Sequence, residues 1–125
     1  GTCGVLENFR GDKLYALLPI EIRVKNGNFF DFDSKYSGQT EEICPGNFSQ
    51  NEREMISHMA RKAHEALGLR HYSCSDFIIT PNGRVYILET NSLPGLTPES
   101  LLPKSLHAVG LRSRDFVEHV LNLVV

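Results

Sequence analysis

Hydrophobic and polar residues alternate along most of the first third of the chain, as they do in strands that bury one face. Gly11 lies in a polar, turn-like stretch between two such segments, and Pro19 interrupts the alternation before it resumes. Asn26-Gly27 is a strong signal for a tight turn, and apolar residues follow it closely. We therefore expect strands over residues 5–9, 14–18 and 21–24, and a further strand that begins at Phe29.

Residues 34–48 show no hydrophobic period and are rich in Gly, Ser, Thr and Pro. This composition predicts a loop of unusual length. Long loops in compact domains are usually functional or disordered.

A helix is predicted to begin after Ser49, because Glu52 follows three residues later and completes a capping box. Apolar residues then recur at helical spacing, and Gly68 marks the expected end. The predicted buried face consists of Ile56, Met59, Ala60, Ala63 and Leu67. The histidines on helical patterns are expected at the surface, namely His58, His64, His107 and His119.

Two apolar runs around Asn82-Gly83 predict a β-hairpin. Thr97-Pro98 supplies a capping residue and a first-turn proline, so a helix is expected from there towards Gly110. Strands early in the chain and helices late in it indicate an α+β fold with a mostly antiparallel sheet flanked by helices. A last helix, capped by Ser113, is expected to bury Phe116, Val117, Val120, Leu121 and Val124.

The composition narrows the class of protein. A chain of 125 residues, 41% of them hydrophobic, can form one compact domain with its own core, covering residues 1–125. The net charge of −2 and the absence of like-charge runs indicate no nucleic-acid or membrane-surface partner. The apolar runs are also shorter than the roughly 20 residues of a membrane span.

The cysteines and the first residues point to a cytoplasmic setting. Cys3, Cys44 and Cys74 are odd in number and lack CxxC spacing, which argues against a disulfide framework or a zinc site. No secretory signal is visible, and the first residue is Gly rather than Met, so we expect a processed or excised piece.

The predicted hairpin brings two carboxylates together. If its turn is symmetric about Asn82-Gly83, Asp76 faces Glu89 and Cys74 faces Asn91, all on one face of the sheet. Like charges directly across two strands repel, so either each acid binds a nearby Lys or Arg, or a cation lies between them. Two carboxylates and one amide oxygen suit Mg²⁺. The opposite face is expected to carry Phe77, Ile79, Tyr86 and Leu88.

The segments around this pair resemble the C-terminal part of D-alanine–D-alanine ligases, which belong to the ATP-grasp superfamily. The run from Leu88 to Thr97 matches the family pattern L-E-x-N-x-x-P-G-M/L-T, and Ser100-Leu101-Leu102-Pro103 fits its S-L-x-P segment. Upstream, Phe30 to Tyr36 is similar to Y-D-Y-x-x-K-Y, and Cys44-Pro45 fits the family's C-P. The resemblance runs from about residue 17 to the end and is most specific over residues 76–104.

The resemblance implies an enzyme that joins two D-alanine molecules for peptidoglycan through an acyl phosphate, with ATP as co-substrate. It implies two Mg²⁺ ions, which Mn²⁺ could replace, and a homodimer for the full-length protein. It also implies roles for individual residues: Asp76, Glu89 and Asn91 as metal ligands, Lys35 at the γ-phosphate, Tyr36 in a covering loop, Phe29 and Leu88 at the adenine, Gly95 as an oxyanion donor, and Ser100 and Leu101 at the second D-alanine.

One position departs from the family pattern. Cys74 stands where the family has an arginine, two residues before the metal-binding Asp. A thiol cannot replace a planar cation with five donors, so we expect catalysis to fall by a factor on the order of 10² or more. Arg70, His71 or Arg84 could compensate.

Three hypotheses follow from these observations. The family's phosphate-binding loop and first D-alanine site lie upstream of anything in this chain, so the fragment alone is expected to be inactive. The loop over residues 34–48 is expected to be mobile, because the rest of the nucleotide pocket is missing. A ligase of the D-alanine–D-alanine type is the first hypothesis. Another ATP-grasp carboxylate–amine ligase, with Cys74 reflecting a different acceptor, is the second. A degenerate nucleotide-binding domain without turnover is the third.

Overall fold

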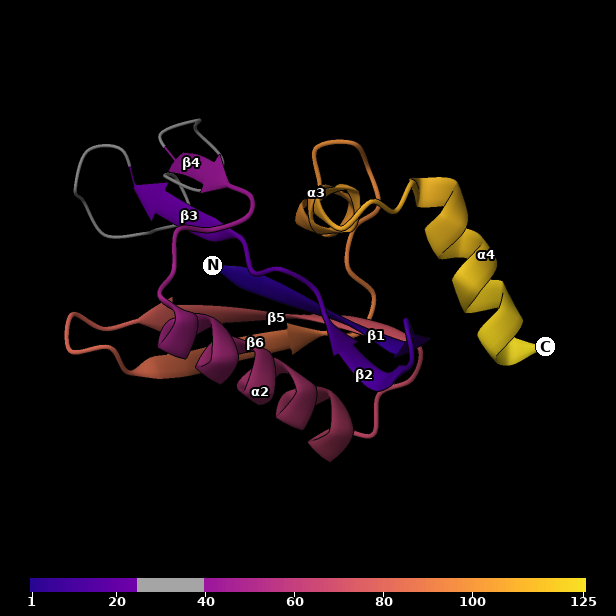
Figure 1. Cartoon of the computed structure of the whole chain (residues 1–125), viewed down its shortest axis with the longest axis horizontal. Helices are drawn as coiled ribbons and strands as arrows, with labels where there is room; N and C mark the ends of the chain where they lie inside the picture. Colours follow the sequence, from indigo (N-terminus) through magenta and orange to yellow (C-terminus); the bar gives the residue numbers. More distant parts are fainter. Residues whose placement is uncertain (25–39) are drawn as a thin grey trace.

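A four-stranded antiparallel sheet in the order β2-β1-β5-β6 lies at the centre of the molecule (Figure 1). The computed structural model describes residues 1–24 and 40–125. The strands are β1 (Thr2–Phe9), β2 (Asp12–Ala16), β5 (Tyr72–Ile79) and β6 (Val85–Asn91). A second sheet pairs β3 (Glu21–Val24) with β4 (Thr40–Ile43). The three described helices are α2 (Gln50–Ala66), α3 (Leu101–Ala108) and α4 (Ser113–Val124).

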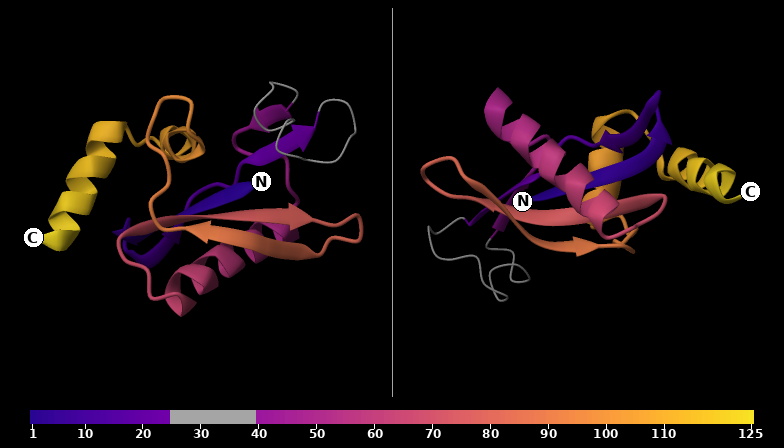
Figure 2. Two further views of the ribbon diagram at one scale, coloured as in Figure 1. Left: turned by 180° about the vertical axis from the view of Figure 1, so that it is seen from behind. Right: turned by 90° about the horizontal axis from the view of Figure 1, so that it is seen from below.

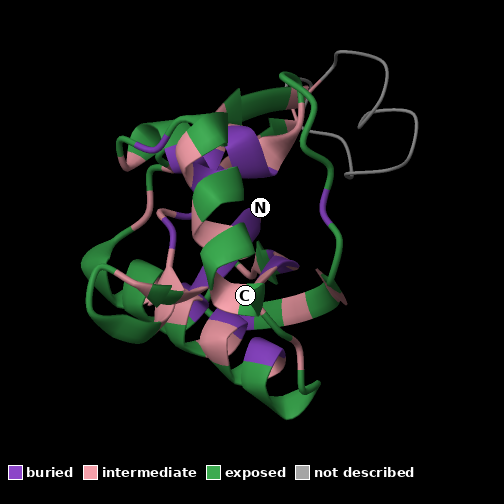
Figure 3. Cartoon of the chain, turned by 90° about the vertical axis from the view of Figure 1, so that its right-hand side faces the viewer, coloured by how far each residue is buried: buried purple, intermediate pink, exposed green. Residues whose placement is uncertain are grey.

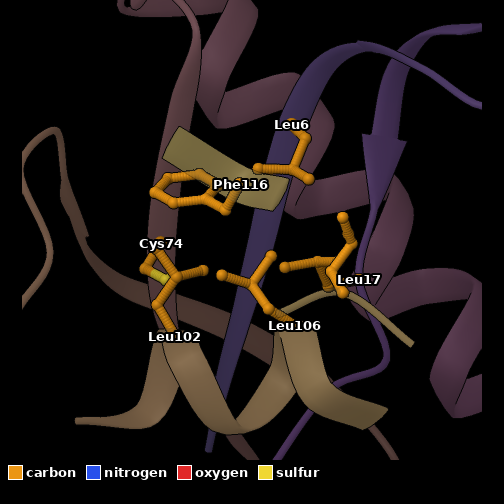
Figure 4. Close-up of a cluster of buried hydrophobic side chains, with 7 residues drawn as sticks. Leu6, Leu17, Cys74, Leu102, Leu106 and Phe116 are labelled. Carbon is orange, nitrogen blue, oxygen red and sulfur yellow. The ribbon is translucent and has the colours of Figure 1, made fainter. Parts of the chain in front are cut away.

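The helices lie on both faces of the central sheet, α2 on one and α3 with α4 on the other (Figures 1 and 2). Side chains alternate along β1, so that Val5 is buried on the α2 face and Leu6 on the α3 face. The α2 face forms one core cluster, of Cys3, Val5, Ile56, Ala60, Phe77 and Val85. The α3 face forms another, of Leu6, Leu17, Cys74, Leu102, Leu106, Leu111 and Phe116 (Figure 4). This arrangement confirms the predicted α+β class with a mainly antiparallel sheet.

The start of α2 follows its predicted signal. The Ser49 hydroxyl accepts a hydrogen bond from the Glu52 N–H, and the Glu52 carboxylate accepts one from the Ser49 N–H. The buried face of α2 differs from the prediction, because Leu67 is the C-cap residue and is 61% exposed, whereas His64 is 1% exposed. The buried stripe therefore runs through Ile56, Ala60 and His64 at steps of four residues.

The predicted long loop over residues 34–48 is wrong for residues 40–43, whereas residues 44–48 lie outside helices and strands as predicted. Residues 40–43 form β4, because they pair in register with β3, with Ile43 opposite Glu21. Several expectations fall within residues 25–39, outside the described residues: the strand from Phe29, the mobility of the loop's first half, and the places of Phe29, Lys35 and Tyr36.

The last two helices differ from the prediction in start and burial. The first of them begins at Leu101 with Ser100 as its N-cap, and Thr97 forms a preceding turn in which its carbonyl accepts from the Ser100 N–H at 2.9 Å. In α4 the predicted buried stripe is largely exposed, because only one edge of the helix packs on the core cluster (Figure 3). Phe116 is buried and Val120 half-buried, whereas Val117, Leu121 and Val124 are 47–57% exposed. None of the helices in the described residues is long and apolar enough to span a membrane.

The hairpin of β5 and β6 contains an irregularity that the symmetric-turn argument did not foresee. Next to the turn, Phe77 pairs with Ile87, and the register shifts by one residue between Asp76 and Phe77. Leu88 is the extra residue on β6, as in a β-bulge. The prediction that Tyr86 and Leu88 share a face with Phe77 is therefore wrong. Both lie on the opposite face of the sheet, where they are 47% and 59% exposed.

Candidate active site

Asp76, Glu89 and Asn91 lie on one face of the β5–β6 hairpin, as predicted. Asp76 is directly opposite Glu89, and Cys74 is directly opposite Asn91. The three oxygen-bearing side chains line a cavity of about 610 Å³ that also reaches Gly95 and Ser100. The structure thus brings together residues of two strands and of the segment that leads into α3.

The donor set in this cavity fits a hard divalent cation. In the described part of the chain, neither Asp76 nor Glu89 forms an ion pair with a Lys, Arg or His side chain. The Asn91 Oδ1 accepts a hydrogen bond from the Leu93 N–H at 3.0 Å, which fixes the direction of the amide. No group of three or more His, Cys, Asp or Glu side chains suited to a metal occurs among residues 1–24 and 40–125. The candidate set is therefore two carboxylates and one amide oxygen, which leaves room for water or phosphate oxygens, as Mg²⁺ prefers.

Cys74 forms part of the wall between this cavity and the core. It is 7% exposed and packs among Leu6, Leu102 and Phe116 (Figure 4). Burial, and secondarily the negative charge of Asp76, raise the pKa of its thiol to about 12. The thiol is therefore protonated at neutral pH and unsuited to act as a nucleophile or a metal ligand.

The described residues that line the cavity include no Arg, Lys or His. None of them can therefore supply the positive charge that the family's arginine would provide at residue 74. Arg70, His71 and Arg84 all lie outside the lining. The lining does include Glu42 and Glu99, which sequence reasoning missed. Glu42 lies on β4 and forms an ion pair with Lys104 of α3. Because that strand was expected to be a loop, no sequence signal placed Glu42 at the site.

Gly95 and Ser100 are in close contact. A Cβ atom on Gly95 would lie 2.8 Å from the Ser100 Oγ, so a larger residue there would displace that hydroxyl. The Ser100 Oγ forms a hydrogen bond with the Thr97 Oγ1 at 2.7 Å. The absence of a side chain at residue 95 therefore keeps the backbone at this point open to the cavity.

Leu88 lines a second, smaller cavity of about 310 Å³. Its walls are mostly apolar and include Ile22, Phe48 and Ile78. Asp76 and Leu101 line both cavities, so the two adjoin at those residues. A narrow apolar cavity beside an acidic one can hold a flat aromatic ring next to phosphates that carry a bound metal ion.

His64 forms a buried polar network that sequence reasoning missed. Its Nε2 lies 3.2 Å from the Glu7 Oε1, and its Nδ1 lies 2.8 Å from the Ser73 Oγ. An ionised carboxylate only accepts hydrogen bonds, so Nε2 carries a proton and donates to Glu7, while Nδ1 is hydrogen-bonded to the Ser73 hydroxyl, which can donate or accept. Burial raises the pKa of Glu7, but hydrogen bonds from His64 and the His71 N–H outweigh it and hold that pKa below its usual value. Ser73 is fully buried, so this network joins α2, β1 and β5 and is closed to substrate.

The fold is that of the C-terminal part of an ATP-grasp ligase, since solved structures similar to it include D-alanine–D-alanine ligases. Residues 2–122 match the family model for the D-ala D-ala ligase C-terminus. The chain belongs to this family.

Relatives and solved structures that are similar to the chain are named as ligases or synthetases of D-alanyl dipeptides or of D-Ala:D-Ser. A D-alanine–D-alanine ligase from Oleidesulfovibrio alaskensis is 46% identical over 98% of this chain and 38% of its own length. One from Leptospira interrogans is 41% identical over 98% of this chain and 35% of its own length. Among solved structures, D-alanyl-alanine synthetase A from Vibrio cholerae matches with a TM-score of 0.76 and 31% identity, over 98% of this chain and 38% of its own. The VanG D-Ala:D-Ser ligase from Enterococcus faecalis matches with a TM-score of 0.80 and 28% identity, over 99% of this chain and 35% of its own. The chain thus spans between a third and two fifths of the length of these proteins.

Proposed function

We propose that residues 1–125 act as the C-terminal ATP-grasp subdomain of a longer, ATP-dependent D-alanine–D-alanine ligase, a cytoplasmic enzyme of peptidoglycan synthesis that forms a homodimer. The observation that carries the proposal is the convergence of Asp76, Glu89 and Asn91 with Gly95 and Ser100 on one cavity. Membership of the family supports it. Because the chain spans only part of its relatives, the fragment by itself is proposed to be inactive.

The proposed reaction has two steps. A carboxylate oxygen of the first D-alanine attacks the γ-phosphorus of ATP, which forms an acyl phosphate and releases ADP. The amine of the second D-alanine then attacks the acyl carbon, the C–O bond to phosphate breaks, and the amine proton leaves with a base. The products are the dipeptide and inorganic phosphate.

Asp76, Glu89 and Asn91 would hold two Mg²⁺ ions, or Mn²⁺ in their place. When bound, the ions would neutralise phosphate charge and help align the transferred group. The carboxylates face each other across the hairpin, so the strands themselves set the spacing of these ligands. The narrow apolar cavity at Leu88 would accept the adenine, together with Phe29.

The remaining residues would bind and orient the amino acids. The Gly95 N–H would donate to the oxyanion that develops on the acyl carbon, and the missing side chain leaves that approach open. Ser100 and Leu101, at the start of α3, would contact the second D-alanine. Lys35 at the γ-phosphate and Tyr36 in a covering loop complete the proposed set.

Phosphate release tests the proposal. The protein to assay is a chimaera in which this chain replaces the matching C-terminal part of the Oleidesulfovibrio alaskensis ligase, with the unaltered ligase as the positive control. We expect D-alanine-dependent phosphate release with ATP and Mg²⁺, and its loss in the Asp76→Asn variant. We expect Cys74→Arg to raise kcat about 100-fold, the reverse of losing an oxyanion donor. No D-alanine-dependent release from the chimaera, with or without Arg at residue 74, would refute the proposal and favour a degenerate nucleotide-binding domain.

A second candidate is another ATP-grasp carboxylate–amine ligase. Two observations favour it: the neutral Cys74 in the cavity wall and the similarity to a structure named a D-Ala:D-Ser ligase. A screen of acceptor amines with the same chimaera separates the two. A kcat/KM at least tenfold higher for D-serine or another amine than for D-alanine would establish the second candidate.

A further inference from the structure

The facing carboxylates of Asp76 and Glu89 destabilise the pairing of β5 and β6 at this point when no cation is bound. They are direct cross-strand partners, and like charges in that position repel. In the described part of the chain, no basic side chain forms an ion pair with either. Interactions next to the pair therefore have to offset this repulsion before a cation is bound.

The strand ladder is interrupted on the turn side of the acidic pair and resumes in the shifted register at Phe77 and Ile87. Immediately beyond Asp76 the register shifts by one residue, with Leu88 as the extra residue. A bulge leaves a residue unpaired and disrupts the ladder locally. The pairs that adjoin the acidic pair without a register shift lie on its other side, where Ser75 pairs with Thr90 and Cys74 with Asn91.

Ser75 and Thr90 are also joined through their side chains. The Ser75 Oγ and the Thr90 Oγ1 form a hydrogen bond of 2.8 Å, and Ser75 is fully buried. The Thr2 hydroxyl donates to the Ser75 carbonyl at 3.2 Å, which ties the pair to β1 as well. Successive side chains point to opposite faces of a strand, so these hydroxyls lie on the α2 face, away from the carboxylates, and do not compete for a cation.

We propose that the Ser75–Thr90 hydroxyl pair positions the two carboxylates for metal binding by holding β5 and β6 in register next to the bulge. This inference rests on the proposed function, in which Asp76 and Glu89 are metal ligands. Ser75 and Thr90 are positioning residues, because they act through the strands that carry those ligands.

The proposal can be tested by measuring how tightly the protein binds Mn²⁺. The electron paramagnetic resonance signal of the free ion reports binding, so no catalytic activity is needed. Thr90→Val keeps the shape of the side chain but removes the hydroxyl, and Thr90→Ser is the matched control that retains it. We expect Thr90→Val to raise the Kd for Mn²⁺ severalfold, with about fivefold as the limit if the whole free energy of one neutral hydrogen bond is lost as metal affinity. We expect Thr90→Ser to remain within twofold of the wild type. Asp76→Asn should abolish the site.

The possible outcomes separate the two proposals. If Asp76→Asn abolishes binding but Thr90→Val binds Mn²⁺ like the wild type, the positioning role is wrong and the proposed function stands. If the wild type and Asp76→Asn bind equally, the metal site is wrong and both proposals fall. Ser75→Ala provides a second variant in case Thr90→Val does not fold. An unchanged Kd in Ser75→Ala would equally overturn the positioning role.

Discussion

Replacing His64 with leucine should destabilise the protein far more than a histidine on a helix surface would suggest. His64 is 1% exposed and connects the Ser73 hydroxyl to the Glu7 carboxylate. Leucine has a similar volume and a better helix propensity, so the change removes hydrogen bonds without opening a large cavity.

The magnitude follows from the groups left behind. The Ser73 hydroxyl is fully buried and would lose its partner, which costs about 1–3 kcal/mol. The Glu7 carboxylate would lose a charge-assisted bond, but it is 24% exposed and keeps the His71 N–H, so this loss lies near the lower end of about 1.5–3 kcal/mol. The added apolar burial offsets about 1 kcal/mol. The net loss in the free energy of unfolding should be about 2–3 kcal/mol, or about 10 °C in Tm for a chain of this size.

Urea denaturation followed by circular dichroism measures this loss. His58→Leu, on an exposed position of the same helix, is the matched control and should change stability by less than about 0.5 kcal/mol. In the His64→Leu background, Ser73→Ala should restore about 1 kcal/mol, because it removes the unpaired hydroxyl. Equal effects of the substitutions at His64 and His58 would refute the reasoning.

Three further predictions follow from the titratable groups and one turn. Because the folded-state pKa of Glu7 is lowered, its contribution to stability is present above the unfolded-state pKa and is lost as pH falls through the folded-state value. Urea titrations should therefore show a deficit for Glu7→Gln at pH 7 that shrinks below about pH 4; a deficit that grows with acid would contradict this. Burial raises the thiol pKa of Cys3 and Cys74 to about 12, whereas Cys44 is only partly buried, so iodoacetamide at pH 8 should label Cys44 first by mass spectrometry. Early labelling of Cys74 would show that the cavity wall opens. Gly83 has a φ of 83° with open space around it, so Gly83→Ala should cost about 1 kcal/mol in urea denaturation through backbone strain alone.

Signals carried by residues close in sequence were sufficient to predict much of the fold. The Ser49–Glu52 capping box and the turn before Asp12 act within a few residues, so their structural meaning does not depend on the rest of the chain. The same holds for the α+β class, because alternation and helical spacing are themselves local patterns. The resemblance of residues 76–104 to the ligase family likewise needed only the order of the residues.

The position of Asp76 directly opposite Glu89 was predicted correctly, but only because two departures from the assumed hairpin cancel each other. The prediction assumed a symmetric turn, whereas the pairing near the turn is shifted by one residue and the Leu88 bulge restores the register. A bulge depends on how both strands pack against their neighbours, so the sequence of the hairpin does not reveal it. The bulge also reversed the predicted faces of Tyr86 and Leu88.

The sequence by itself determined the fold class, the family and the face shared by the side chains of Asp76, Glu89 and Asn91, because each rests on local patterns or on a contiguous motif. Only the tertiary structure decided which apolar and polar positions are buried. His64 is buried because Glu7 and Ser73, from strands distant in sequence, satisfy both of its ring nitrogens. Val117 and Leu121 are exposed because only one edge of α4 meets the core cluster. Burial depends on which segments pack together, and that is a property of the whole chain.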